Sequence, residues 1–326
     1  MSNKLTSALL VQVDHEPDGS LAAASGKLLA LASTLTDGPV VVLSFVESDV
    51  AELAALGADR VFVGRAEGFS PRVPGGVADA LASAVTSLGA DLGAVLLSST
   101  YLGRGAGAMF AARQGIGAAV DIASVEVEEG ILTGRKSALA GTWITTVAAD
   151  EGTPVLAVRP GVGPQDDAKV MAGGATKAEP LSFELSRGSA AVRVVSSQKQ
   201  PAGARVPLGD ADVAVVAGRG IDGDVSLVEH LADALGAAIG ATRVVCDEGW
   251  LPRSTQIGQT GVSIAPKLYL GLGVSGAVHH TCGMLASEKI VAVVDDPDAP
   301  ILEIADFAVV GDLNEVVPQA LEALNL

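Results

Sequence analysis

The sequence predicts a two-domain α/β protein, and three observations support this fold class. The chain has 326 residues, which is long for a single compact core. Short apolar runs typical of buried strands alternate with amphipathic helical patterns in both halves. Ala, Val, Leu and 39 Gly dominate a composition with only 3% aromatic residues, as in close-packed layers joined by tight turns. We therefore expect an N-terminal α/β domain with added antiparallel strands and a C-terminal doubly wound parallel sheet.

The first half of the chain alternates strands with helices as far as residue 114. The expected strands are Ala8 to Val13, Val40 to Phe45, Arg60 to Val63 and Ala94 to Ser98, and the expected helices are Leu21 to Thr34, Ala51 to Leu56, Gly76 to Leu88 and Gly103 to Gln114. Five short strands without helices follow, at Ile122 to Val127, Ile131 to Ala138, Thr142 to Val147, Val155 to Val158 and Ala191 to Val195. We interpret these five as antiparallel additions to a first domain at 1–195.

A polar stretch from Ser196 to Leu208, with prolines at 201 and 207, lacks periodicity and is the expected linker. The alternation of strands and helices then restarts and defines a second domain at 209–326. Its expected strands are Ala211 to Val216, Arg243 to Cys246, Leu268 to Leu272, Ile290 to Val293 and Phe307 to Val310, and its expected helices are Val225 to Ile239 and Asp312 to Ala323. Right-handed crossovers would join these strands into a doubly wound sheet.

The composition argues against several classes of function. Lys and Arg total 21 against 38 Asp and Glu, and the formal net charge of −17 opposes binding to nucleic acid or anionic lipid. Simple solubility and an acidic docking surface both account for this charge. No apolar stretch approaches the roughly 20 residues that span a bilayer, and Met1 to Asp14 lacks a signal or transit pattern. We expect a cytoplasmic protein without membrane insertion. Cys246 and Cys282 are far apart and indicate neither a disulfide nor a zinc site.

Glycine-rich polar segments follow the strands of the second domain, at the edge where parallel sheets bind ligands. They are Gly218-Arg219-Gly220, Gly240 to Arg243, Gln256 to Gly261 and Gly273 to His280. In the last of these, Ser275-Gly276 stands at an expected helix start. Backbone N–H groups, a hydroxyl and the positive helix end would together suit a diphosphate there. Taken alone, the same pair is also explained as an ordinary helix cap.

The charged and reactive side chains of this domain leave some alternatives open. Arg243 opens an expected strand, and both a ligand contact and a salt bridge to Asp247 or Glu248 account for it. His279 and His280 are adjacent in an expected helix and face different ways, so we expect no metal site. One of the two is better placed to donate a hydrogen bond to a ligand. No base is identifiable beside either cysteine, and we expect no catalytic residue.

Three segments of the second domain strongly resemble the alpha subunit of electron-transfer flavoproteins. They read GATRVVCDEGWLPRSTQIGQTG, LYLGLGVSGAVHHTCGM and IVAVVDDPDAPILEIADFAVVGDLNEVVP, and their motifs follow the order and spacing of that family. The match spans the second domain almost completely. The first domain is more weakly similar, through the Gly103-Arg104 segment and the GRKSALAG strand pair.

The resemblance implies one FAD per heterodimer, held chiefly by the second domain, with a smaller beta subunit that completes the site and binds AMP. Electrons would arrive from dehydrogenases, such as the acyl-CoA dehydrogenases of fatty acid beta-oxidation, and leave to a membrane quinone reductase or similar acceptor. The chain would be an electron carrier rather than an enzyme. The residues that the resemblance assigns to FAD are Arg219, Thr242, Arg243, Ile257, Gly258, Gln259, Thr260, Ser275, Gly276, Ala277, Val278, His279, His280, Asp312 and Leu313.

Within that set, the resemblance implies distinct roles. Arg243 would stabilise negative charge on the reduced flavin ring, Thr260 would face its N5 edge and His280 its N1 and O2 edge. Asp312 and Leu313 would reach the adenosine end. The expected linker would let the FAD domain swing as a rigid body toward a docked redox partner.

Departures from the family pattern keep two alternatives open. Val294, followed by Asp295 and Asp296, replaces the usual asparagine, Val216-Ala217 replaces the serine and glycine common before Arg219, and His279 replaces the frequent glutamine. A flavin-free regulatory subunit that still binds a nucleotide would explain the first two changes. A nicotinamide-dependent dehydrogenase is disfavoured, because the first strand ends Val11-Gln12-Val13-Asp14 with no GxGxxG after it.

Overall fold

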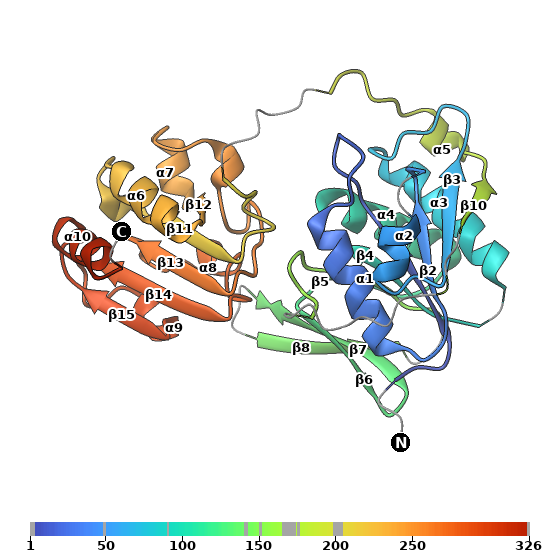
Figure 1. Ribbon diagram of the computed structural model, residues 1–326, viewed down its shortest axis with the longest axis horizontal. Coiled ribbons are helices and arrows are strands. Elements are labelled where there is room, and N and C mark those ends of the chain that lie inside the picture. Colours follow the sequence, from blue (N-terminus) through green and yellow to red (C-terminus); the bar gives the residue numbers. More distant parts are fainter. Residues whose placement is uncertain are drawn as a thin grey trace. The chain divides into compact units, whose positions relative to one another are not determined.

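A computed structural model of the chain describes residues 4–47, 50–89, 91–139, 143–149, 152–164, 174, 177–197 and 205–324. The chain divides into two compact units, Met1–Lys136 with Ile144–Gln200 and Ser137–Trp143 with Pro201–Leu326. Each unit contains its own parallel sheet (Figure 1). Residues 198–204 of the expected linker lie outside the described residues. The α/β fold class with two parallel-sheet domains is confirmed.

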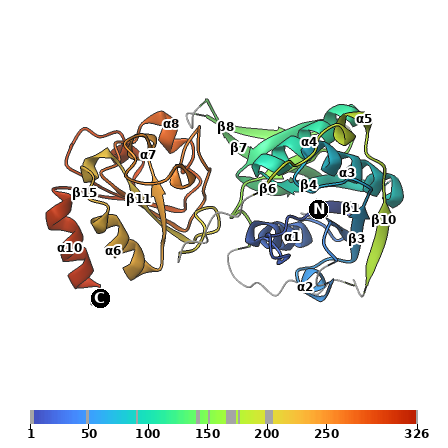
Figure 2. The same cartoon turned by 90° about the horizontal axis from the view of Figure 1, so that it is seen from above.

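The first unit is built on a seven-stranded sheet in the order β10-β3-β2-β1-β4-β9-β5, whose neighbouring strands are all parallel. The strands are β1 (Ala8–Gln12), β2 (Val40–Ser44), β3 (Arg60–Arg65), β4 (Leu92–Ser98), β5 (Ala118–Ile122), β9 (Val155–Val158) and β10 (Ala178–Ser182). The helices are α1 (Ala23–Leu35), α2 (Val50–Ala55), α3 (Pro74–Leu88), α4 (Tyr101–Gln114) and α5 (Arg187–Ala190). Figure 2 shows α1 and α2 on one face of the sheet and α3 and α4 on the other.

The helices on both faces explain the sequence of the central strands. Every residue of β2 is buried, and its VVVLS run has no polar alternation, as expected for a parallel strand covered on both sides. Two separate cores result. Leu28 of α1 belongs to the core on one face, and Val77 and Leu81 of α3 belong to the core on the other.

The antiparallel addition is smaller than expected. It is a three-stranded sheet of β6 (Ser124–Glu128), β7 (Ile131–Ala138) and β8 (Trp143–Ala148). The expected strand from Ile122 to Val127 is in fact two strands, because the chain leaves the parallel sheet at Ala123 and pairs antiparallel with β7 from Ser124 onward. The run Val155 to Val158 is also not antiparallel, since it pairs parallel with β4.

The sequence prediction placed one strand of the first unit wrongly. Residues 191–195 form no strand and instead follow α5, whose N-terminus is capped by Ser186. The missing strand is β10, with the sequence AEPLS. Its proline breaks the usual strand pattern, but β10 is an edge strand that pairs only with β3, and proline is tolerated at such an edge.

The second unit is a five-stranded parallel sheet in the order β12-β11-β13-β14-β15. The strands are β11 (Val213–Ala217), β12 (Ala238–Ala241), β13 (Leu268–Leu272), β14 (Lys289–Val294) and β15 (Phe307–Val310). The helices are η2 (Arg219–Ile221), α6 (Ser226–Leu235), α7 (Arg243–Asp247), η3 (Arg253–Thr255), α8 (Val278–Thr281), α9 (Ile301–Ile304) and α10 (Leu313–Ala323). Along the chain, β12 is added on one side of β11 and β13 is then added on its other side. This change of direction creates a switch point, where ligands of such folds bind.

Two elements near this switch point differ from the sequence prediction. Helix α6 ends at Leu235, because Gly236 takes the left-handed φ of 61° and closes it. Strand β12 (Ala238–Ala241) begins at Ala238 and Ile239, which were expected to be the last two residues of that helix. The expected strand from Arg243 to Cys246 is helix α7. The β12 run Ala-Ile-Gly-Ala is small and apolar throughout, so its periodicity does not distinguish a strand from a helix.

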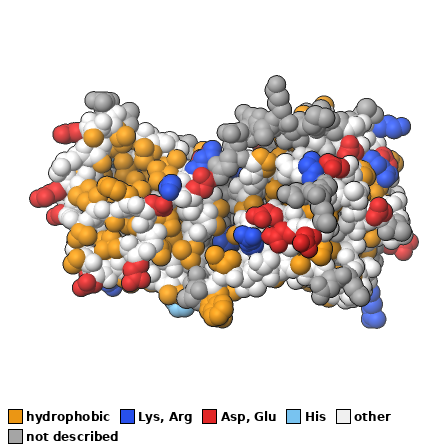
Figure 3. Space-filling view, turned by 90° about the horizontal axis from the view of Figure 1, so that it is seen from below, with side chains coloured by type: hydrophobic (Ala, Val, Ile, Leu, Met, Phe, Trp, Pro, Cys, Tyr) orange, Lys and Arg blue, Asp and Glu red, His pale blue; other side chains and the backbone are white. Residues whose placement is uncertain are grey.

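On the face drawn in Figure 3, Asp and Glu side chains occur on each unit, interspersed with Lys and Arg. Within the described ranges, no helix combines the length and apolarity that crossing a membrane requires.

Candidate functional site

The loops after β11 and β13 meet backbone to backbone at the switch point of the second unit. The Gly218 N–H donates to the Leu272 carbonyl at 2.8 Å, and the Gly220 N–H donates to the Gly273 carbonyl at 3.1 Å. A Cβ on residue 218 would stand 2.1 Å from the Gly273 oxygen. Only glycine permits this approach, which brings Arg219 to the same sheet edge as the loop after β13.

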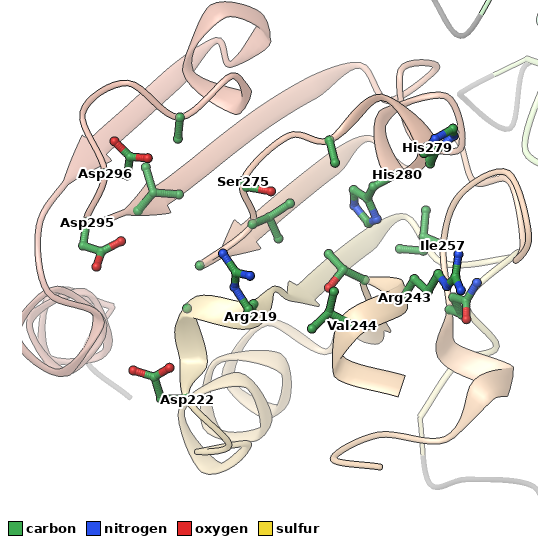
Figure 4. Close-up of a pocket in the computed structure, with 18 of the residues that line it drawn as sticks. Arg219, Asp222, Arg243, Val244, Ile257, Ser275, His279, His280, Asp295 and Asp296 are labelled. Carbon is green, nitrogen blue, oxygen red and sulfur yellow. The ribbon is translucent and has the colours of Figure 1, made fainter. Parts of the chain in front are cut away.

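A cavity of about 590 Å³ opens at this edge (Figure 4). Its wall contains ten of the fifteen residues that the sequence resemblance assigned to a ligand: Arg219, Thr242, Arg243, Ile257, Gln259, Thr260, Ser275, Ala277, His279 and His280. They come from the loops after β11, β12 and β13 and from the segment between η3 and β13. Residues from Arg219 to His280, far apart in the sequence, are thus brought together by the parallel sheet.

The other five assigned residues are not in the cavity wall. Gly258 and Gly276 have φ values of +126° and +85°, and a Cβ on either would meet backbone atoms at 2.3 Å and 2.2 Å. They are needed for the close packing of the loops. Val278 opens α8 and is half exposed. Asp312 caps α10 by accepting from the Asn314 N–H at 2.8 Å, and Leu313 is buried in the core. Their contact with a ligand stays a prediction.

The cavity also contains residues that the sequence did not single out as ligand contacts, among them Asp222, Gln256, Asp295 and Asp296. Asp295 and Asp296 directly follow β14, so the rule that ligands lie at the ends of parallel strands would have found them. Asp222 follows η2 with a left-handed φ of 47°. No sequence signal identified that conformation.

The cavity is acidic at one end and basic at the other. Figure 4 places Asp222, Asp295 and Asp296 at one end and Arg243 and His279 at the other, with Arg219 and Ser275 between them; this last pair comes from the loops after β11 and β13. A ligand with an extended shape and unlike ends would therefore meet unlike electrostatic surroundings along the cavity.

Arg243 differs from the prediction in conformation but not in location. It is the first residue of helix α7, and its side chain is 71% exposed rather than held in a strand. Its Nε donates to Asp247 Oδ2 at 3.2 Å, which is one of the two salt bridges considered from the sequence. It also lines the cavity. The two alternatives considered for Arg243 are therefore compatible.

The segment after η3 is held by a chain of side-chain contacts. Gln256 is almost fully buried, and its Nε2 donates to Thr260 Oγ1 at 2.8 Å. The Gln259 N–H donates to the His279 carbonyl at 2.8 Å, and Gln259 Oε1 lies 2.7 Å from His279 Nδ1. These contacts fix the Thr260 hydroxyl and the His279 ring relative to the cavity.

Ser275 does not begin a helix, so the predicted helix start at Ser275-Gly276 is wrong. Helix α8 starts three residues later, is four residues long, and follows Ala277 without a side-chain cap. The Ser275 carbonyl instead accepts from the Ile301 N–H at 3.1 Å. A phosphate near Ser275 would meet the Ser275 hydroxyl and Arg219 in the cavity wall, while the four-residue helix α8 is too short to contribute a substantial helix dipole.

Two buried polar atoms of the cavity residues have no hydrogen-bond partner among the described residues, Thr242 Oγ1 and His280 Nδ1. Burial lowers the pKa of the His280 imidazole to about 4, and hydrogen bonding toward the Ile257 backbone, which falls short of ordinary hydrogen-bond geometry, opposes this shift more weakly. The ring is therefore neutral near pH 7. Among the described residues, no group of three or more His, Cys, Asp or Glu side chains is arranged to hold a metal ion.

Comparison with known proteins agrees with this arrangement. Residues 9–186 match the family described as "Electron transfer flavoprotein domain", and residues 207–285 match "Electron transfer flavoprotein FAD-binding domain". The chain is 38% identical over 321 residues to "Electron transfer flavoprotein subunit alpha" of Mycobacterium leprae (strain TN), with 97% of each chain covered. The chain belongs to the electron transfer flavoprotein alpha subunit family.

Alpha subunits from distant bacteria are also similar over nearly their whole length. The protein of Thermoanaerobacterium thermosaccharolyticum is 31% identical, covering 95% of this chain and 96% of the relative. The protein of Pseudomonas aeruginosa is 33% identical, covering 97% of this chain and all of the relative. The resemblance noted from the sequence motifs is confirmed, and it extends to the first unit.

Proposed function

We propose that the second unit binds FAD in the cavity at its switch point, and that the chain is the FAD-carrying alpha subunit of a heterodimeric electron-transfer flavoprotein. The observation that supports this proposal most directly is a pair of buried polar atoms in the wall of one cavity, Thr242 Oγ1 and His280 Nδ1, which make no hydrogen bond among the described residues. A buried polar atom without a partner costs about 1–3 kcal/mol. The polar edge of a flavin ring would satisfy both atoms.

The volume of the cavity and the family description also support FAD as the ligand. Its volume lies within the ~300–1,000 Å³ typical of small-molecule sites. The matched family description names an FAD-binding domain for residues 207–285. The cavity volume, the family description and the two buried polar atoms together favour FAD over a smaller nucleotide.

Bound FAD would supply the redox chemistry, since its ring takes up and releases electrons. The chain's own residues set the surroundings of that ring. Arg243 places a guanidinium at one end of the cavity, where it favours negative charge on a reduced ligand. Thr260, fixed by Gln256, presents a hydroxyl, and the neutral His280 ring adds a polar atom without adding charge.

The opposite end suits the adenosine half of the cofactor. Carboxylates of Asp222, Asp295 and Asp296 accept hydrogen bonds from hydroxyl and amino groups and repel phosphate. Arg219, between the two ends, is the cation best placed for the diphosphate. Val294 lines the cavity and is almost fully buried, and its apolar side chain offers no hydrogen bond there.

The remaining parts of the assignment rest on family membership. We infer a beta subunit that completes the site and binds AMP, dehydrogenases such as acyl-CoA dehydrogenases as electron donors, and a quinone reductase or similar acceptor. We also infer domains at 1–195 and 209–326 joined by a linker at 196–208 that permits the FAD domain to reorient. In this role the chain carries electrons and turns over no substrate of its own.

Co-purification with the beta subunit tests the proposal. The complex is expected to be yellow, to contain one FAD, and to lose flavin absorbance when a dehydrogenase and its substrate are added. A colourless complex that takes up no added FAD would instead support a regulatory subunit without flavin, the alternative that Val294 favours.

A further inference from the structure

Tyr269 and His280 form a buried pair behind the cavity wall. Tyr269 lies on β13 and is fully buried, and its hydroxyl oxygen lies 2.8 Å from His280 Nε2. The ring centroids are 6.1 Å apart, so the hydroxyl makes the contact rather than the ring faces. Gly271 leaves room for the tyrosine, since a Cβ there would stand 3.0 Å from Tyr269 Cε1.

The surroundings decide which partner of this hydrogen bond donates. The structure gives the Tyr269 hydroxyl one hydrogen-bond partner among the described residues, His280 Nε2. If Nε2 carried the ring proton and donated it, the tyrosine proton would be left in the apolar core without an acceptor, which costs free energy. Burial raises the pKa of Tyr269, so the hydroxyl keeps its proton. The arrangement that satisfies both groups has Tyr269 donating to Nε2.

The consequence reaches the cavity through the other nitrogen of the imidazole. Burial lowers the pKa of His280, and a neutral imidazole carries one proton. With Nε2 acting as the acceptor, that proton resides on Nδ1. This buried nitrogen makes no hydrogen bond of ordinary geometry among the described residues, and the Ile257 backbone beside the ring favours a protonated nitrogen only weakly.

We propose that Tyr269 is a positioning residue that fixes His280 as the Nδ1–H tautomer, so that His280 presents a hydrogen-bond donor to the ligand of the cavity. This inference rests on the proposed function for the identity of that ligand. A donor stabilises an acceptor edge that gains negative charge on reduction, whereas the Nε2–H tautomer would present a lone pair that repels it.

Nitrogen-15 NMR on histidine-labelled full-length protein tests the tautomer without requiring activity. The chain has four histidines, and the signals of His280 are assigned by their loss in His280→Gln. At neutral pH and before FAD is added, we expect a protonated, pyrrole-type Nδ1 and an unprotonated, pyridine-type Nε2. Added FAD is expected to shift the Nδ1 signal.

Tyr269→Phe removes the hydroxyl and keeps the ring. We expect the proton of His280 to move toward Nε2 and FAD to bind about fivefold more weakly, as for the loss of one hydrogen bond. Tyr101→Phe is the matched control, because Tyr101 is 84% exposed and belongs to the other unit. In this control, the tautomer of His280 and the affinity for FAD should both match those of the wild-type protein.

A wild-type Nε2–H tautomer, a charged ring at neutral pH, or an unchanged His280 spectrum in a folded Tyr269→Phe would each overturn the inference. If Tyr269→Phe does not fold, the tautomer of His280 measured in the wild-type protein decides whether the inference holds. Failure of FAD to bind to the complex with the beta subunit would remove the proposed function and leave the tautomer assignment standing, so the two failures are distinguishable.

Discussion

Arg243 and Asp247 form an ion pair across one turn of α7, with Nε and Oδ2 3.2 Å apart. Arg253 pairs with the same carboxylate. Two guanidinium groups thus share one carboxylate, and of these three groups Arg243 lines the cavity. Because Arg243 is mostly exposed, its ion pair contributes only about 0–1 kcal/mol to stability. The side chain can exchange this contact for one with a ligand at little cost.

We therefore expect Arg243→Ala to weaken FAD binding about 10- to 100-fold, the loss of one charge-assisted hydrogen bond, and to change the free energy of unfolding by less than about 0.5 kcal/mol. Fluorescence titration with FAD and urea denaturation measure the two effects. Arg205→Ala is the control, since Arg205 pairs with Asp233 away from the cavity. Equal FAD affinity in the two variants would remove Arg243 from the site.

Gly218 should not tolerate a side chain. A methyl group at this position would overlap the Gly273 carbonyl and force the two loops apart, so we expect Gly218→Ala to lower the free energy of unfolding by about 1–3 kcal/mol and to weaken FAD binding. Gly209→Ala is the control, because a Cβ at residue 209 would meet no atom within 4 Å. A Gly218→Ala protein as stable as this control would contradict the packing described for the switch point.

His280 should make stability depend on pH. Its pKa falls from 6.5 to about 4 on folding, so between these values the unfolded chain binds a proton that the folded chain does not. The contribution of the neutral ring is therefore complete above pH 6.5 and is lost as the pH falls toward 4, up to about 3 kcal/mol.

Denaturation of wild type and His280→Gln between pH 7 and pH 4 checks this expectation. The wild-type free energy of unfolding should fall more steeply than that of the variant in this range. Parallel curves would show that His280 titrates normally in the folded protein.

Val294 should reveal whether a ligand reaches the end of β14. Val294→Asn buries an amide at a position almost closed to solvent, and we expect the FAD-free protein to lose about 1–3 kcal/mol. If FAD offers the amide a partner, adding FAD should stabilise this variant more than it stabilises Val294→Ala. Thermal melts with and without FAD measure the difference, and equal shifts would place the cofactor away from residue 294.

The sequence predicted the framework of the second unit but not the local geometry of its site. The apolar runs of β13, β14 and β15 are bounded by turn residues, and they were placed within a residue of their observed ends. Strand β12 was missed because Ala-Ile-Gly-Ala carries no periodic signal, and this error displaced the expected strand onto α7.

For the candidate site too, the sequence predicted which segments lie together but not their detailed contacts. The family resemblance assigned fifteen residues to a ligand, and ten of them line the cavity. They lie together because the ends of neighbouring parallel strands converge at one edge of the sheet. The hydrogen bond between Tyr269 and His280 was not predicted, because it depends on how a core side chain and a loop pack across eleven positions of sequence. The pairing of Gly218 with Gly273 likewise depends on a contact between two loops that neither sequence segment specifies alone.

The central claim is that FAD occupies the cavity at the β11–β13 switch point. Flavin content of the complex with the beta subunit tests it most directly, measured for wild type beside Gly218→Ala and Gly209→Ala. We predict one FAD per complex in wild type and in Gly209→Ala, and substantially less in Gly218→Ala. Wild-type protein without flavin, or full flavin content in a folded Gly218→Ala, would contradict this assignment.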